Sequence, residues 1–173
     1  LSLTEDWVSG IIGHRQQAIQ LVKGLIFQLA ALHSYDELKL AFIYDPKEQE
    51  LWDFVKWLPH VWQHEKGVRL IATNPNELKE LSAFLDKEFA MRRSITNEEE
   101  RKEVTPHYVI FALDKGLCGK SEVINNVMKE KKNFGFSVVN LHDELKNLPK
   151  ECSIVVECSD YEAKMYDKDD ITG

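Results

Sequence analysis

Apolar residues follow two alternating spacings along the chain, and this alternation predicts the fold class. Between residues 17 and 33 they recur every three or four positions, as on one face of an amphipathic helix. Short apolar runs such as residues 108–113 separate the helical segments and are typical of strands buried on both faces. The predicted strands are residues 7–12, 38–44, 68–72, 108–113, 136–141 and 153–157. The predicted helices are residues 17–33, 48–58, 74–92 and 121–132, with a helical turn at 143–148 and a charged loop or short helix at 96–103.

Strands alternate with helices along most of the chain, which predicts an α/β fold with a mainly parallel sheet flanked by helices. Ligands of such sheets bind at the carboxyl ends of the strands, where the strand order reverses. Residues that directly follow a predicted strand are therefore the functional candidates. They are residues 10–17, 45–47, Asn74, 114–121 and His142.

The chain has 173 residues, of which 43% are hydrophobic and 29% charged, and this composition predicts a single globular domain over residues 1–173. Because the sequence begins with Leu1 rather than methionine, we expect it to be part of a longer protein. A net charge of −7 argues against a protein that coats nucleic acid. The three cysteines lack the spacing of a metal finger and fit a reducing compartment.

The first candidate phosphate loop joins the first predicted strand to the first long helix. A working Walker A loop, G-x-x-x-x-G-K-[ST], needs glycines that turn backbone N–H groups onto the phosphates, a lysine for their charge and a hydroxyl for magnesium. Here the lysine and hydroxyl positions hold other residues, of which Arg15 is able to meet an anion at the helix start. The alternative is a plain strand–turn–helix corner that needs glycine for its backbone angles. The candidate positions are Gly10, Gly13, His14, Arg15, Gln16 and Gln17.

A second stretch also follows a strand, and it ends in Gly119-Lys120-Ser121. Asp114 stands where the first glycine of a phosphate loop belongs, and its carboxylate would repel phosphate. The simpler interpretation is a polar loop with Lys120 in solvent and Ser121 capping the next helix. Asp114 also ends a Walker B-like strand, where it would hold magnesium through water. Because Lys115 follows it, no base that activates water is present there.

Aromatic residues and two histidines crowd the segment from residue 52 to residue 64. Dense aromatic side chains are typical of a core or of a surface that meets a partner. The candidate docking residues are Trp52, Trp57, Pro59, His60 and Trp62. His60 and His64 are four apart, which leaves a two-histidine metal site as an alternative to imidazoles at or near the surface. Val61 stands where a zinc protease needs glutamate, so that activity is excluded.

Three segments resemble one family. They are "QLAALHS" at residues 28–34, "DELKL" at residues 36–40 and "KWLPH" at residues 56–60. Together they resemble the EssC/EccC group of FtsK/SpoIIIE-like ATPases of type VII secretion systems. The resemblance covers roughly residues 9–157. It points to the ATPase-like segment between the membrane anchor and the first full FtsK domain, which is thought to be degenerate.

The resemblance implies a RecA-like, P-loop-NTPase-like fold in a cytoplasmic domain of a cell-membrane protein. The Walker A position of the family falls on residues 10–17 and its Walker B position on the strand that ends at Asp114. Because both depart from a working motif, we expect a non-hydrolysing domain that couples or regulates the secretion motor. It implies no cofactor for this domain, with ATP and magnesium belonging to the parent protein. The implied partners are other domains of the same ATPase, membrane proteins of the secretion machinery and, in the parent, further copies in a hexamer.

Two rival functions stay open at this point. One is an active nucleotide-binding enzyme that uses Arg15 or Lys120 against phosphate. The other is a DNA-translocating module of the FtsK kind, although the acidic balance and the lack of a basic stripe favour no nucleic-acid partner.

Overall fold

A computed structural model describes residues 2–63, 65 and 67–167, which form a seven-stranded sheet in the order β5-β2-β6-β7-β1-β8-β9. Its first six strands in this order are parallel, and β9 runs antiparallel to β8 at one edge. The predicted mainly parallel sheet is therefore confirmed. The strands are β1 (Val8–Gly13), β2 (Leu38–Ile43), β5 (Ile71–Ala72), β6 (His107–Ala112), β7 (Phe136–Leu141), β8 (Ile154–Cys158) and β9 (Ala163–Asp167).

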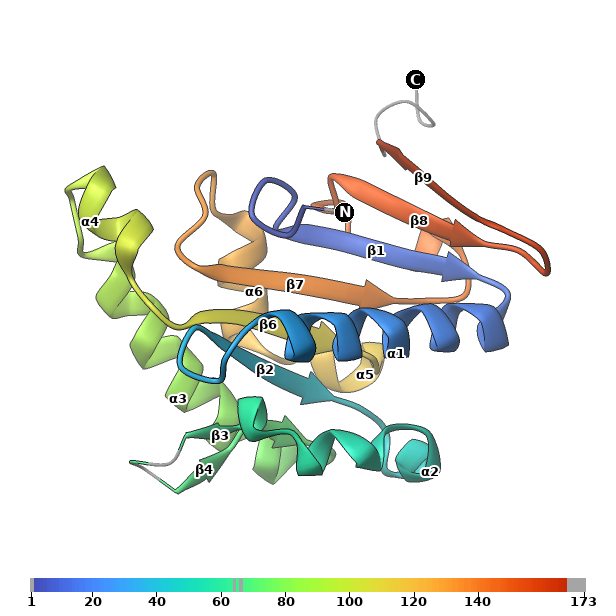
Figure 1. The fold of residues 1–173 in the computed structure, drawn as a ribbon, viewed down its shortest axis with the longest axis horizontal. Helices are drawn as coiled ribbons and strands as arrows, with labels where there is room; N and C mark the ends of the chain where they lie inside the picture. Colours follow the sequence, from blue (N-terminus) through green and yellow to red (C-terminus); the bar gives the residue numbers. More distant parts are fainter. Residues whose placement is uncertain (1, 64, 66, 168–173) are drawn as a thin grey trace.

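Helices cover both faces of this sheet (Figure 1). The α-helices are α1 (Arg15–Leu32), α2 (Gln49–Trp52), α3 (Pro75–Arg93), α4 (Glu98–Glu103), α5 (Lys115–Cys118) and α6 (Glu122–Lys129). The 3₁₀ helices are η1 (Pro46–Glu48), η2 (Asp53–Trp57), η3 (Pro59–Val61) and η4 (Leu145–Asn147). A short hairpin of β3 (Trp62–Gln63) and β4 (Val68–Arg69) precedes β5. Helix α1 and the α2–η2 segment lie on the front face in Figure 1, and α3, α5 and α6 lie behind the sheet.

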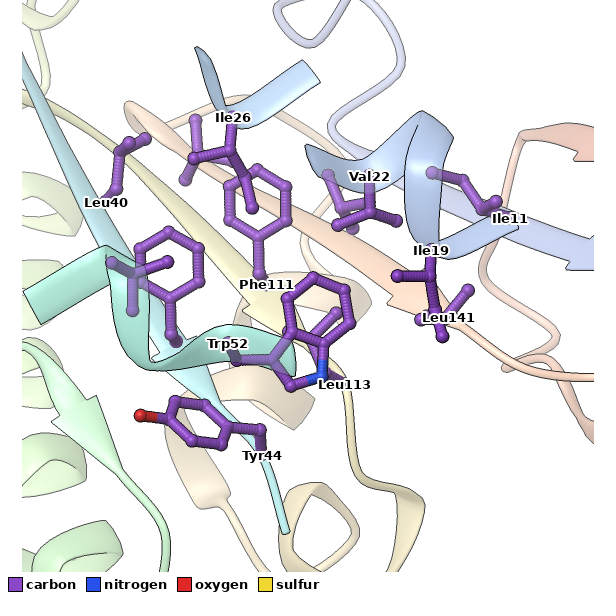
Figure 2. Packing of buried hydrophobic residues seen from close by; sticks show 14 of the residues in the cluster. Ile11, Ile19, Val22, Ile26, Leu40, Tyr44, Trp52, Phe111, Leu113 and Leu141 are labelled. Atoms are coloured by element: carbon purple, nitrogen blue, oxygen red, sulfur yellow. The ribbon is translucent and has the colours of Figure 1, made fainter. Parts of the chain in front are cut away.

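The front core forms between α1, the α2 segment and the sheet. The apolar stripe of α1, spaced three and four apart, buries Ile19, Val22 and Ile26 against the strands (Figure 2). Trp52 is fully buried among the same residues. This packing fixes the position of α1, and with it the corner that joins α1 to β1.

Helix α3 dominates the back core, and its start matches the sequence prediction. Asn74 caps it by accepting a hydrogen bond from the Glu77 amide at 2.9 Å, and the Glu77 carboxylate in turn accepts from the Thr73 amide at 2.9 Å. The buried side of the helix then packs on the sheet. Its buried apolar residues are Leu78, Leu81, Leu85 and Phe89.

Arg92, in the last turn of α3, is fully buried although it carries a charge. Its guanidinium donates hydrogen bonds to the carbonyl oxygens of Pro106 (2.5 Å), Phe134 (3.3 Å) and Gly135 (3.3 Å). It lies 5.1 Å from the ring centre of Tyr108. One arginine therefore joins the end of α3 to the segments that enter β6 and β7.

Two predicted elements are divided in the structure. The predicted helix over residues 48–58 is α-helical only through Trp52 and continues as the 3₁₀ helix η2. The predicted strand over residues 68–72 is divided at Leu70, because β4 pairs with β3 whereas β5 joins the main sheet. A short helix, α5, occupies the place of the predicted polar loop after Asp114.

Candidate functional site

The carboxyl ends of β1 and β7 define the place where a sheet of this order binds ligands. The chain leaves β1 through α1 on the front face, where Ile11 is buried with α1 residues. It leaves β7 through η4 on the opposite face, where Leu148 packs with Val8 and Ile12 of β1. Adjacent parallel strands whose connections depart to opposite faces open a crevice between their ends. The segments after β1 and β7 therefore line the candidate site.

The connection from β1 to α1 is a corner with one intervening residue, His14. The Gly13 amide donates to the Asp143 carbonyl oxygen at 3.2 Å, and the His14 amide donates to the Cys158 carbonyl oxygen at 2.9 Å. A phosphate loop turns such amides toward the nucleotide. Here these amides donate instead to backbone carbonyls in the segment after β7 and at the end of β8.

The two glycines of the candidate loop serve packing and backbone geometry. A Cβ atom on Gly10, which lies inside β1, would approach the Leu148 side chain to 2.6 Å. Gly13 has a φ of +109°, and a Cβ atom there would lie 2.1 Å from the Cys158 carbonyl oxygen. Gly13 therefore requires glycine without any ligand, which is the alternative that the sequence left open, whereas at Gly10 the Leu148 side chain would have to shift.

Arg15, the cation at the start of α1, faces acidic side chains. Its guanidinium forms an ion pair with Glu48 of η1 and lies 3.9 Å from an Asp143 carboxylate oxygen. His14 Nε2 lies 3.4 Å from Asp160, and Gln16 and Gln17 are exposed. Carboxylates at this distance compete with an incoming phosphate for the guanidinium, and they repel a triphosphate.

Asp114, the Walker B-like residue, caps a helix. Its carboxylate accepts a hydrogen bond from the Leu117 amide at 3.0 Å and so begins α5 directly after β6. Strand β7 separates β6 from β1. The carboxylate is thus engaged by the chain itself, and Lys115, which follows it, is exposed.

Two side chains behind the crevice, the partly buried His142 and the buried Cys118, have shifted pKa values. A cavity of about 340 Å³ behind the ends of β6 and β7 is lined by His142 and Cys118, among others. Burial lowers the pKa of His142, and the Lys115 charge lowers it further against the opposing effect of Asp143 and Asp114. Burial raises the pKa of the Cys118 thiol to about 12. Burial thus favours the neutral forms of the His142 imidazole and the Cys118 thiol.

The second candidate loop has no phosphate-binding shape. Lys120 is exposed to solvent, and the buried Ser121 hydroxyl accepts a hydrogen bond from the Ile124 amide at 3.4 Å. Ser121 thus caps α6, and α5 lies between β6 and this segment. This geometry agrees with the simpler interpretation of the Gly119-Lys120-Ser121 sequence.

The aromatic segment divides between core and surface, which corrects part of the predicted docking set. Trp52 is fully buried, and the buried His60 donates through Nε2 to the His33 carbonyl oxygen at 2.7 Å. Neither side chain is able to meet a partner. Trp62 is half-buried, with Arg69 4.5 Å from its ring centre. Trp57, which is 88% exposed, and the exposed Pro59 remain as docking candidates.

Two classes of site and segment were searched for in the part of the chain that the structure describes. Within residues 2–63, 65 and 67–167, no group of three histidine, cysteine, aspartate or glutamate residues is placed to hold a metal ion. His64, the second member of the predicted histidine pair, lies outside the described residues. No described helix has both the length and the apolar character needed to cross a membrane.

ATP with magnesium, the cofactor that the resemblance associates with the parent protein, does not fit the residues present here. The Gly13 and His14 amides are already bonded, Arg15 is paired, and Asp114 caps a helix. Glu48 and Asp143, which the sequence does not mark as site residues, are the acidic side chains near Arg15. Their only sequence signal is position, because each lies a few residues after a strand that ends at the same edge.

The sequence is similar to those of secretion proteins. No protein-family model matches it. It is 22% identical over 148 residues to the ESX secretion system protein EccC of Geobacillus thermodenitrificans, covering 86% of this chain and 10% of that protein. It is 21% identical over 150 residues to the type VII secretion system protein EssC of Staphylococcus aureus, covering 84% and 10%. The chain thus spans about a tenth of the length of these relatives.

Solved structures share the fold. EssC (ATPases 2 and 3) from Geobacillus thermodenitrificans superposes with a TM-score of 0.72 at 10% identity, over 95% of this chain and 38% of that one. The cytoplasmic domain of EssC superposes with a TM-score of 0.67 at 12% identity, over 98% and 36%. Thermomonospora curvata EccC (ATPases 2 and 3), in complex with a signal sequence peptide, gives 0.59 at 17%, over 91% and 32%. The resemblance to the EssC/EccC group is thereby confirmed, and the position before the first FtsK domain stays a prediction.

Proposed function

We propose that this chain, a distant relative of the EccC and EssC ATPases, is a non-hydrolysing coupling domain of a type VII secretion ATPase. On this proposal it lies on the cytoplasmic side of the membrane, as do the solved relatives described as cytoplasmic domains. Its partners are the other domains of the same polypeptide and membrane proteins of the secretion machinery. Assembly of the parent into a hexamer remains a prediction.

The closed corner after β1 is the observation that carries this proposal. An ATPase of this fold needs amides that are free to hold phosphate oxygens, together with a lysine and a magnesium-binding hydroxyl. In this chain the Gly13 and His14 amides bond to backbone carbonyls, and the local cation Arg15 is paired with Glu48. A fold kept without its nucleotide site fits a role in transmitting movement between neighbouring domains.

The rival enzyme function requires this corner to open. Arg15 would have to leave Glu48, and the Cys158 carbonyl would have to release the His14 amide. A DNA-translocating module receives no support from the charge, which is −7 over the whole chain.

Calorimetry with ATP and magnesium tests the proposal. We expect no binding heat at nucleotide concentrations up to about 1 mM. A dissociation constant of about 1 mM corresponds to a binding free energy of about 4 kcal/mol, so any binding would be weaker than that. Glu48→Gln is the informative variant, because it releases Arg15 while the bonded amides stay in place, and we expect it to remain silent as well. Binding by the unaltered chain that Arg15→Ala abolishes would contradict the proposal and favour an active nucleotide-binding enzyme.

Trp57 is expected to matter for docking and not for folding. Because its side chain is 88% exposed, Trp57→Ser should change the free energy of unfolding by less than about 0.5 kcal/mol. In the parent ATPase the same change should reduce export of its substrates, since an exposed tryptophan is a typical anchor of an interface. Met91→Ser, at a 53% exposed position on α3 behind the sheet, is the control. Normal export by the Trp57→Ser protein would remove the docking role.

A further inference from the structure

The front face of the sheet is only partly covered. In Figure 1, α1 and the α2–η2 segment cross the front of the sheet, whereas β8 and β9 at the upper edge have no described helix in front of them. A groove of about 480 Å³ runs between α1 and these two strands. Parallel sheets of α/β proteins normally have helices on both faces, because both faces are apolar.

The groove has two mainly apolar walls without a charged side chain. Leu21, Gly24 and Leu25 of α1 form one wall, which the polar side chains of Gln20 and Gln28 of the same helix also line. Val156 of β8 with Ala163 and Met165 of β9 form the other, and Met165 is 54% exposed. None of the nine residues that line the groove is charged. Water therefore contacts an apolar surface here, and an uncharged apolar occupant would exclude it most favourably.

Gly24 gives the helical wall its depth. A Cβ atom at Gly24 would meet no atom within 4 Å, so the backbone of α1 is open to the groove at this point. Glycine destabilises a helix interior relative to alanine, and none of the described residues makes a contact at Gly24 that offsets this loss. An occupant that approaches the α1 backbone closely would offset this loss.

The uncovered strip at the front of the sheet is two strands wide. Two neighbouring strands span about 10 Å, which is the diameter of a helix with its side chains. Nine lining residues are far fewer than the roughly 20–30 a side of a stable interface between separate proteins. A helix tethered in the same polypeptide has an effective concentration in the millimolar range, so a small contact suffices to hold it.

We infer that this groove receives an uncharged, apolar helix from a neighbouring part of the same polypeptide. The inference rests on the proposed function, in which this chain is one domain of a longer ATPase, as the tenfold greater length of its relatives suggests. The helix lies alongside α1 over β8 and β9 and completes the front layer. A movement of the neighbouring domain then reaches α1 and its corner with β1 directly.

Oxidation of methionine by hydrogen peroxide in the parent protein tests the inference. Met165 and Met91 are 54% and 53% exposed in this chain, on the groove and on α3 respectively, so they form a matched pair. We expect Met165 to oxidise at least about tenfold more slowly than in a Gly24→Arg variant, which places a charged side chain in the groove. The Met91 rate should be the same in both proteins. Gly24→Ala adds only a methyl group to the groove and should raise the oxidation rate of Met165 less than Gly24→Arg does.

Three results would overturn the inference. Equal oxidation rates of Met165 in the unaltered and Gly24→Arg proteins would show that nothing occupies the groove or that the helix packs elsewhere. Protection that disappears on dilution of the parent would assign the groove to a second copy. Protection that appears only when an exported substrate is added would assign it to that substrate. The calorimetric test of nucleotide binding is independent of all three results, so the proposed function and this inference fail separately.

Discussion

Replacing Arg92 with methionine is expected to lower the free energy of unfolding by about 3–5 kcal/mol, the usual loss when one member of a buried charged network is removed. The change would remove the donor that the Pro106 and Phe134 carbonyl oxygens share in a partly buried setting, whereas the Gly135 carbonyl oxygen would keep its hydrogen bond from the Tyr108 amide. It would also remove the partner of Glu88, whose carboxylate lies 3.4 Å from Arg92 Nε. Denaturant unfolding of the purified chain measures the effect.

The adjacent residue provides a matched control for this prediction. Arg93 has a half-exposed side chain and forms one ion pair, with Glu130 at 3.0 Å. Because solvent screens such pairs, Arg93→Met should cost no more than about 1 kcal/mol. Similar losses of stability in the two variants would show that Arg92 does not hold the end of α3 to the segments that enter β6 and β7.

Replacing Gly13 with alanine is expected to lower the free energy of unfolding by about 2–5 kcal/mol, combining backbone strain with steric overlap. The φ of +109° disfavours any residue with a Cβ atom, and that atom would lie 2.1 Å from the Cys158 carbonyl oxygen. The end of β8 would have to move away from β1 to accept it. Thermal or denaturant unfolding measures the loss.

A second glycine separates this effect from a general cost of substitution. Gly24→Ala should raise the stability of the chain by about 0.5–1 kcal/mol, because the position is helical and open. If Gly13→Ala left stability within about 1 kcal/mol of the unaltered chain, the tight corner after β1 would not exist as described.

Elements were readily predicted from the sequence because they depend on local spacing. The stripe of Ile19, Val22 and Ile26 placed α1 within two residues of its observed start, and the capping pattern at Asn74 placed the start of α3. Helix α5 was missed because it has four residues and contains Gly116, so it carries no periodicity. The sequence allows Asp114 either to belong to a polar loop or to hold magnesium through water, and in the structure its carboxylate caps that helix.

The candidate site was harder to predict because long-range contacts decide its character. The sequence left two interpretations of the β1–α1 junction, and the carbonyls of Asp143 and Cys158, distant in the chain, distinguish them. Glu48, the partner of Arg15, is 33 positions away and belongs to no motif. Likewise, helical spacing alone did not separate Trp52 from Trp57, because the change to a 3₁₀ helix after Trp52 alters which side chains face inward.

The hydrogen bonds that close the β1–α1 corner join backbone to backbone. On the proposed function no nucleotide enters or leaves between these groups, so the bonds keep the same partners throughout the cycle of a neighbouring ATPase domain. Switch segments in active nucleotide hydrolases, by contrast, are ordered by the terminal phosphate and released when it departs. The proposal therefore implies a domain that makes no movement of its own and transmits, as a rigid body, the movements that hydrolysing domains generate.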